Sequence, residues 1–262
     1  MIDLNKLNPE QKQAVLTTEG PLLILAGAGS GKTRVLTYRA AYLLEKGVPP
    51  WAILAITFTN KAAREMRERI NRLAGEAADD MWVMTFHALS ARILRRDIEK
   101  LGYKREFSIY DDDDQMTLIK RILKKLDISD KSYPPRAVKS VISDAKNHML
   151  SPEEWLKDNP DFRSKPYYRA YCEYEKELKE NNALDFDDLI LKTLELLTEH
   201  PPVLEVYRRK FSYIMVDEYQ DTNMAQYMLV RTLAGDKKNV CVVGDDDQSI
   251  YGWRGADLRN IL

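Results

Sequence analysis

Residues 26–33 have the types and spacing that hold phosphate groups. They follow the apolar run 21–25 and read Ala26, Gly27, Ala28, Gly29, Ser30, Gly31, Lys32 and Thr33. A strand, a glycine-rich loop, Gly-Lys-Thr and a helix in this order form a phosphate-binding loop, in which backbone N–H groups and a helix N-terminus surround phosphate oxygens. The Lys32 ammonium is expected on the β- and γ-phosphates, and the Thr33 hydroxyl on Mg²⁺.

The first position of this loop is Ala26, where a glycine is usual. A flexible glycine-rich turn is the alternative interpretation of the same residues. The strand pattern before the loop and the helix pattern after it favour phosphate binding over a plain turn.

A carboxylate pair follows a second apolar run. Asp217 and Glu218 stand directly after residues 211–216. Beside a nucleoside triphosphate, the first carboxylate can hold Mg²⁺ directly or through water, and the second can accept a proton from the attacking water. Exposed acidic pairs are common, so the pair alone is weak evidence. After a buried strand, in a chain with a phosphate-binding loop, it predicts ATP hydrolysis.

A third polar segment comes after the apolar run 240–243. It begins at Gly244 and contains Gln248. An amide at a neighbouring strand end can contact the γ-phosphate or the attacking water, so Gln248 is the candidate sensor residue. Without the other motifs, an Asp- and Ser-rich turn would be the better interpretation.

All three segments follow short apolar runs, which read as buried parallel strands because they are continuous rather than alternating. The expected strands are 22–26, 53–57, 82–85, 213–216 and 240–243. Amphipathic stretches at 61–73 and 88–101 read as helices between the early strands. This alternation predicts a doubly wound α/β sheet with ligands at the carboxyl ends of its strands.

The strand pattern stops between Thr85 and Tyr213, where no good parallel-strand candidate occurs. Helices are expected there at 115–126, 135–146, 152–157, 167–179 and 186–197. We therefore expect a helical subdomain at 105–185, inserted between sheet segments 1–104 and 186–262. The acidic run Asp111–Asp114 could be a metal cluster, but its position before a helix favours an N-terminal cap. Near the end of another helix, Lys146 and Asn147 could touch duplex DNA or form a solvated helix end.

Composition narrows the class of protein. The chain has 262 residues, a net charge of −1 and two cysteines in unrelated contexts. Near-neutral charge means that a nucleic-acid partner must be held by a local groove. The cysteine usage fits a reducing compartment, so a cytoplasmic location is expected. There is no signal-peptide pattern and no apolar run long enough for a membrane span, so no membrane association is expected.

Aromatic side chains stand just beyond the expected strand ends. They are Phe58, Phe86, Tyr251 and Trp253. Loops at strand ends face solvent or ligand. Stacking of bases on aromatic side chains binds single-stranded nucleic acid and contributes ~1–3 kcal/mol of binding free energy per base. Small polar and basic residues beside Phe58 could contact phosphates without reading sequence. These are Thr57, Thr59, Asn60, Lys61 and Arg64.

Together these motifs resemble superfamily 1 DNA helicases of the UvrD/Rep/PcrA family along the whole chain. The residues that carry the resemblance are 7–11, 26–33, 56–63, 85–87, 184–189, 217–222 and 244–256. The resemblance implies a RecA-like P-loop NTPase domain with an inserted all-helical subdomain. It also implies ATP and Mg²⁺ as cofactors, and single-stranded DNA and single-strand/duplex junctions as partners.

The resemblance also assigns residues. Gln11 matches an adenine-reading glutamine, Arg254 matches an arginine near the γ-phosphate, and His87 matches a DNA-backbone contact. Phe58 and Trp253 match base-stacking residues. Arg34 and Arg39 follow the phosphate loop and are expected near the nucleotide, although a surface salt bridge is an equal alternative for Arg39.

We therefore expect the N-terminal ATP-binding half of a 3′-to-5′ DNA helicase. A second RecA-like domain of the same protein would supply arginine fingers, so this chain should bind Mg-ATP and weakly bind single-stranded DNA, with little hydrolysis. One alternative is a P-loop kinase or transferase, which the Glu218 and Gln248 pattern disfavours, because these residues suit water as the nucleophile. The other is a nucleotide-gated DNA-binding or protein-docking module without catalytic activity.

Overall fold

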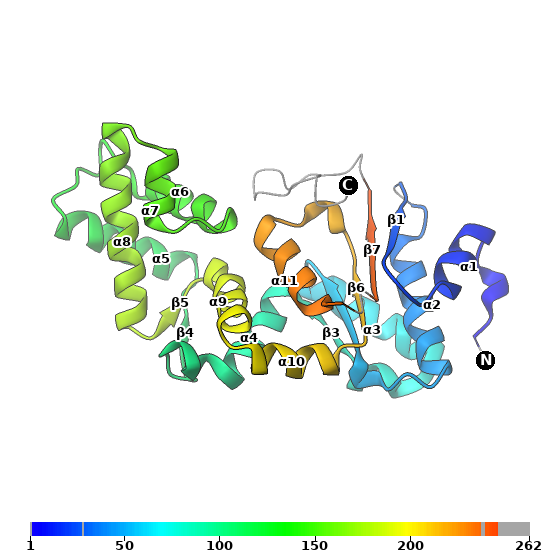
Figure 1. Ribbon diagram of the computed structural model, residues 1–262. Coiled ribbons are helices and arrows are strands. Elements are labelled where there is room, and N and C mark those ends of the chain that lie inside the picture. The colour runs from blue at the N-terminus through cyan, green and yellow to red at the C-terminus, as the bar shows by residue number, and fades with distance from the viewer. Residues whose placement is uncertain (1, 28, 237–238, 246–262) are drawn as a thin grey trace. The chain divides into compact units, whose positions relative to one another are not determined.

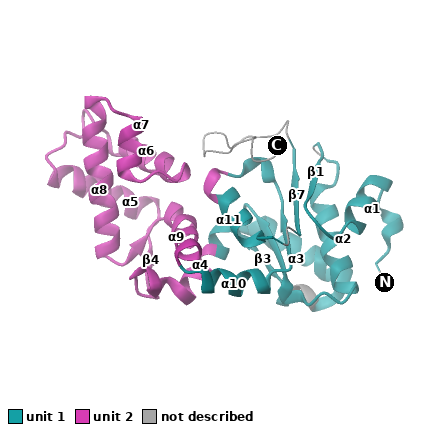
Figure 2. Cartoon of the chain, viewed as in Figure 1, with its two compact units in different colours: residues 1–89, 200–222, 226–262 teal, residues 90–199, 223–225 magenta. Residues whose placement is uncertain are grey.

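The computed structural model describes residues 2–27, 29–236 and 239–245 (Figure 1). Contacts divide the chain into two compact units, which are coloured separately in Figure 2. We call residues 1–89, 200–222 and 226–262 the sheet unit, and residues 90–199 and 223–225 the helical unit. The helical unit is therefore longer than the insertion expected at 105–185.

The sheet unit is built on five parallel strands. They are β1 (Leu22–Leu25), β2 (Ile53–Thr57), β3 (Trp82–Thr85), β6 (Tyr213–Val216) and β7 (Val240–Gly244), in the order β1-β7-β6-β2-β3. These are the five strands that the apolar runs predicted, and the α/β class is confirmed. All strands run in one direction, so their carboxyl ends meet at one edge of the sheet, where ligands of such folds bind.

The strand order decides which loops become neighbours. Strand β7 lies between β1, which precedes the phosphate loop, and β6, which precedes the acidic pair. Leu25 is opposite Gly244 in the register, and the N–H of Ala26 donates to the carbonyl of Gly244 over 3.0 Å. The residue after β7, Asp245, therefore lies between the phosphate loop and the acidic pair.

Helices of the sheet unit bury apolar residues against this sheet. They are α1 (Pro9–Leu16), α2 (Lys32–Glu45), α3 (Asn60–Ala74), α10 (Pro201–Lys210) and α11 (Met224–Ala234), whose first two residues belong to the helical unit, and α4 (Phe86–Asp97) begins here. Leu36 and Leu43 of α2 and Met66 of α3 share one core with alternate strand residues such as Ile53 and Ala55. The buried residues of this core are at most 7% exposed, and their packing holds the sheet beneath the loops.

The helical unit has its own core. Its helices are α5 (Asp112–Lys125), α6 (Pro135–Asn147), α7 (Pro152–Asp158), α8 (Lys165–Glu180) and α9 (Phe186–Glu199). Asp111 accepts hydrogen bonds from the N–H groups of Asp113 and Asp114, which confirms the acidic run as a helix cap. Two paired strands, β4 (Ser108–Ile109) and β5 (Ala183–Leu184), were not expected, because two residues are too few to form a pattern.

A buried ion cluster lies inside the helical unit. The Lys146 ammonium is 1% exposed and contacts the carboxylates of Asp185, Asp188 and Glu175 at 2.8, 2.7 and 2.7 Å. Burial alone would lower the pKa of Lys146, but the facing carboxylates raise it well above its usual value. Lys146 therefore joins helices in the core, and both expectations for it, a duplex contact and a solvated helix end, are wrong.

The side chain of Asn147 also forms its hydrogen bonds within this unit. Its side chain donates to the carbonyl of Ser143 over 2.8 Å and accepts from the Asn223 amide over 2.6 Å. None of the helices among the described residues is both long and apolar enough to cross a membrane.

Candidate nucleotide-binding site

The phosphate loop has the backbone that its glycines predict. Gly29 and Gly31 have φ of 74° and 87°, in the left-handed region that glycine enters at little cost. Gly31 is the N-cap of α2, and a Cβ there would lie 2.9 Å from the Gln11 amide nitrogen. Because no side chain of the described residues caps α2, the N–H groups of its first turn stay available for an anion.

Gln11 connects α1 to this loop. Its backbone N–H donates to the Asn8 side chain over 2.8 Å, and its side-chain oxygen accepts from the Asn8 N–H over 3.2 Å. Its Nε2 donates to the carbonyl of Ser30 over 2.7 Å. Gln11 thus lies against the phosphate loop, and its reading of adenine stays a prediction.

The lysine of the loop is already paired. Lys32 Nζ lies 2.9 Å from Asp245 Oδ2, and the two side chains are only 9% and 1% exposed. A buried ammonium needs a compensating charge. Here a carboxylate at the end of β7 supplies that charge at the position where the sequence predicts phosphates.

Two oxygen groups meet at the expected metal position. The Thr33 hydroxyl donates to Asp217 Oδ2 over 2.9 Å. Burial raises the pKa of Asp217, the Thr33 hydrogen bond lowers it, and the net direction is upward. Mg²⁺ prefers oxygen ligands and is commonly held by one or two protein groups plus substrate phosphates, so this donor pair fits it. Within the described residues, no group of three or more acidic, His or Cys side chains could hold a metal ion.

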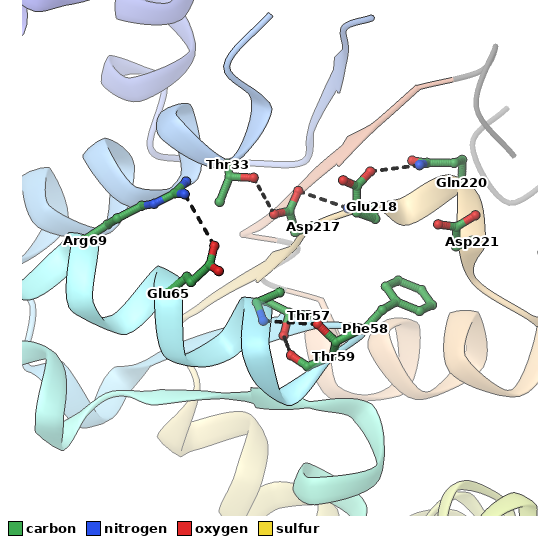
Figure 3. A pocket seen from close by; sticks show the side chains of 11 residues that line it. Thr33, Thr57, Phe58, Thr59, Glu65, Arg69, Asp217, Glu218, Gln220 and Asp221 are labelled. Atoms are coloured by element: carbon green, nitrogen blue, oxygen red, sulfur yellow. Dashed lines mark hydrogen bonds and ion pairs between the residues drawn. The ribbon is translucent and has the colours of Figure 1, made fainter. Parts of the chain in front are cut away.

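Glu218 adopts an uncommon backbone conformation beside this pair. Its φ and ψ are 50° and 45°, a left-handed geometry that costs a non-glycine residue roughly 1–3 kcal/mol. Its N–H donates to Asp217 Oδ1 over 3.0 Å. Its carboxylate accepts from the Gln220 amide over 2.8 Å, as the dashed line in Figure 3 marks. Residues held in such conformations cluster at functional sites.

A cavity of about 390 Å³ opens beside these carboxylates (Figure 3). It is bounded by the acidic pair on one side and by the segment after β2 and the start of α3 on the other. Its lining residues are Thr33, Thr57, Phe58, Thr59, Ala62, Glu65, Arg69, Asp217, Glu218, Gln220 and Asp221. The acidic pair therefore shares one cavity with Phe58 and Thr59, which were predicted to bind DNA.

The segment after β2 is ordered by local hydrogen bonds. The Thr57 hydroxyl donates to the carbonyl of Thr59 over 3.1 Å, and Thr59 caps α3 by accepting from the Ala62 N–H over 3.1 Å. Thr59, Asn60 and Lys61 are exposed, and Phe58 is partly exposed. These residues are accessible to a ligand.

Phe86 does not have the exposure that its strand-end position suggested. It is 1% exposed, and its ring packs edge-on against Phe58 with centroids 5.5 Å apart. Helix α4 begins immediately after β3, so no loop separates Phe86 from the core. Phe86 supports Phe58 and is not available for base stacking. His87, the next residue, is partly buried.

Arg39 has a structural role that differs from both expectations. It is 1% exposed, and its guanidinium donates to the carbonyl of Ala14 in the last turn of α1 and to those of Thr17 and Thr18, which follow the helix. Carbonyls at a helix C-terminus lack partners within the helix, and a buried cation satisfies them. Arg34 is exposed, and it donates to the carbonyl of Lys6 over 2.7 Å.

Five predicted site residues lie outside the described part of the chain: Ala28, Gln248, Tyr251, Trp253 and Arg254. Among the residues without a predicted role, Asp245 and Gln220 contact predicted site residues directly. Asp245 pairs with Lys32, and Gln220 contacts Glu218. An available signal was that Asp245 is separated by one residue from the apolar run 240–243, close to the position that Asp217 has after its own run.

The phosphate loop, the Thr33–Asp217 pair and the parallel sheet define a P-loop nucleoside-triphosphate-binding domain. The chain belongs to the family described as the UvrD/REP helicase N-terminal domain, whose model matches residues 7–262.

The curated relatives are longer proteins. The chain is 57% identical to "ATP-dependent DNA helicase PcrA" of Bacillus subtilis (strain 168) over 99% of its own length and 35% of the relative's. It is 56% identical to proteins of the same name from Staphylococcus aureus (strain Mu50) and Staphylococcus epidermidis, over 99% of the chain and 36% of each relative. The chain thus spans about a third of the length of these curated relatives.

Proposed function

We propose that this chain is the ATP-binding portion of an ATP-dependent DNA helicase. The observation that carries the proposal is the Lys32, Thr33 and Asp217 arrangement at the carboxyl end of a parallel sheet. Family membership and the names of the PcrA relatives support it.

Each residue of the site has a role in this proposal. Lys32 leaves Asp245 and binds the β- and γ-phosphates, while the N–H groups at the start of α2 bind phosphate oxygens. Thr33 and Asp217 would hold Mg²⁺, which would neutralise charge on the phosphates. Glu218 accepts the proton of the attacking water, and Gln248 senses the γ-phosphate. Gln11 and Arg254 contact the nucleotide.

Single-stranded DNA is the proposed second ligand. Phe58 and Trp253 stack on bases, Thr59, Asn60 and Lys61 contact phosphates, and His87 and Tyr251 complete the surface. The opening of Phe58 and Thr59 onto the cavity of Glu218 supports communication between DNA and ATP. The whole helicase is proposed to step 3′-to-5′ along single strands, to open single-strand/duplex junctions, and to act in the cytoplasm.

A second RecA-like domain is proposed to complete the ATP site. Arginine fingers from such a domain contribute ~10³–10⁵ in rate. This chain alone is therefore expected to bind ATP and to hydrolyse it very slowly.

ATP hydrolysis and DNA binding test the proposal in the same preparation. We expect weak binding of an oligo(dT) strand by fluorescence anisotropy, and near-zero ATP turnover with or without that strand. Fast DNA-stimulated turnover would contradict the need for a second domain. The alternative, a nucleotide-gated module without catalytic activity, makes a different prediction. DNA binding would respond to ATP, but no hydrolysis would occur even after a second RecA-like domain is joined to the chain.

A further inference from the structure

Gln220 is a buried residue of the site without a role in the mechanism above. It lies on the 3₁₀ turn η6 (Tyr219–Asp221), two residues after Glu218, and is 2% exposed. Its side-chain amide bridges two elements of the sheet unit. Nε2 donates to Glu218 Oε2 over 2.8 Å, and Oε1 accepts from the backbone N–H of Asp245 over 3.0 Å.

The orientation of this amide follows from its partners. A backbone N–H can only donate, so the Gln220 oxygen must face Asp245. The amide nitrogen then faces Glu218, whose carboxylate oxygen accepts from it. Both partners therefore select the same orientation.

The bridge continues to the phosphate loop. Asp245, whose N–H contacts Gln220, holds Lys32 through its carboxylate at 2.9 Å. Glu218, Gln220, Asp245 and Lys32 thus form one connected series from the expected general base to the expected phosphate-binding cation. Asp245 and Gln220 are 1% and 2% exposed, so water screens the contact between them very little.

Glu218 needs such support because of its backbone. Its left-handed φ of 50° is unfavourable for a residue with a Cβ, and it persists only when surrounding contacts fix it. The Asp217 carboxylate fixes the backbone N–H, and Gln220 fixes one carboxylate oxygen.

We propose that Gln220 is a positioning residue that links the orientation of the Glu218 carboxylate to the partner of Lys32. With Lys32 on Asp245, Gln220 holds Glu218 as the structure describes. When phosphate oxygens take Lys32, Asp245 is released, and its backbone transmits the change through Gln220 to Glu218. This inference rests on the proposed function, because it treats Lys32 as a phosphate ligand and Glu218 as the base.

The side-chain amide resonance of Gln220 tests the link directly. The chain is labelled with [¹⁵N]glutamine, and the Gln220 signal is identified by its absence in Gln220→Met. We expect Glu218→Gln to shift this signal, because a neutral amide accepts a weaker hydrogen bond than a carboxylate. We expect Asp245→Asn, and separately a non-hydrolysable ATP analogue with Mg²⁺, to shift it as well.

The same spectrum contains its controls. Glu65→Gln neutralises another carboxylate that lines the cavity but lies outside the series, and it should leave the Gln220 signal in place. Gln115, which donates to the carbonyl of Tyr110 in the helical unit, reports whether a variant is folded. Gln11, which donates to Ser30 in the phosphate loop, reports whether the nucleotide has bound.

The outcomes separate the two proposals. A shifted Gln11 signal with a fixed Gln220 signal would show nucleotide binding without the link, which overturns this inference alone. No change at Gln11 with the analogue would count against the proposed function. In that case Asp245→Asn still decides the inference, since an unmoved Gln220 signal in a folded Asp245→Asn chain overturns it.

Discussion

The ammonium of Lys32 and the carboxylate of Asp245 form a buried ion pair at 2.9 Å across 213 residues of sequence. In the proposed function, a triphosphate that binds Lys32 takes the place of this carboxylate. We therefore expect Asp245→Asn to tighten ATP binding about tenfold, equivalent to ~1.4 kcal/mol, because its Lys32 lacks a charged partner before binding.

Isothermal titration with ATP and with AMP measures this effect. AMP has no β- or γ-phosphate, so its affinity should be the same in both proteins. Weaker ATP binding by Asp245→Asn would mean that Asp245 helps to hold the nucleotide. That result would contradict the replacement of the Asp245 carboxylate by phosphate oxygens at Lys32.

Phe58 is expected to contribute to binding of single-stranded DNA. Replacing it with Ala should cost about 1–3 kcal/mol per lost base stack. Fluorescence anisotropy with a labelled oligo(dT) measures the loss. Phe162→Ala is the matched control, because Phe162 is 78% exposed but lies in the helical unit. Equal losses in the two variants would argue against a specific role for Phe58.

The ion cluster of Lys146 makes a prediction about stability. Lys146→Met leaves three carboxylates facing one another without their cation, so we expect a loss of about 3–5 kcal/mol in the free energy of unfolding. Urea unfolding followed by circular dichroism measures it. Lys125→Met removes a lysine that is 52% exposed and leaves its buried partner Glu177 paired with Arg121, so it should change stability little. Similar effects of the two substitutions would contradict a structural role for the cluster.

The raised pKa of Asp187 predicts that the free energy of unfolding depends on pH. Burial first, and then the charge of Asp185, raise its pKa from 3.8 to about 6, although a hydrogen bond from Ser143 opposes the shift. A carboxyl group with a raised folded-state pKa contributes stability that is complete below pH ~4 and lost as the pH rises through ~6.

Asp187→Asn cannot ionise, so it should lose less stability over that range. We expect its free energy of unfolding to rise relative to the unsubstituted chain by ~1–3 kcal/mol between pH ~4 and ~7. Urea unfolding at several pH values measures the difference. A difference that stays constant with pH would show that Asp187 does not titrate in this way.

The sequence predicted much of this fold because the signals are local. Continuous apolar runs located all five strands of the main sheet, and the Asp111 cap located the start of α5. Contacts between distant segments were not predictable in the same way. The pairing of Lys32 with Asp245 depends on β7 lying beside β1, which only the sheet order reveals.

Burial of polar and aromatic side chains was the other reason why the structure differs from the expectations based on sequence. Arg39, Phe86 and Lys146 belong to residue types that also bind ligands, and all three are 1% exposed. Their partners are the end of α1, Phe58 and a carboxylate cluster, each brought near by packing rather than by a sequence pattern. Residue type alone therefore overestimated how many of them face a ligand.

The most direct test of the account is equilibrium binding of a fluorescent ATP analogue to this chain, with Mg²⁺ and with a chelator. We predict saturable binding that weakens without Mg²⁺ and is lost in Lys32→Ala, because Lys32, Thr33 and Asp217 then no longer act together. Binding that is unchanged by Lys32→Ala, or no binding by the unsubstituted chain, would contradict the assignment of this site.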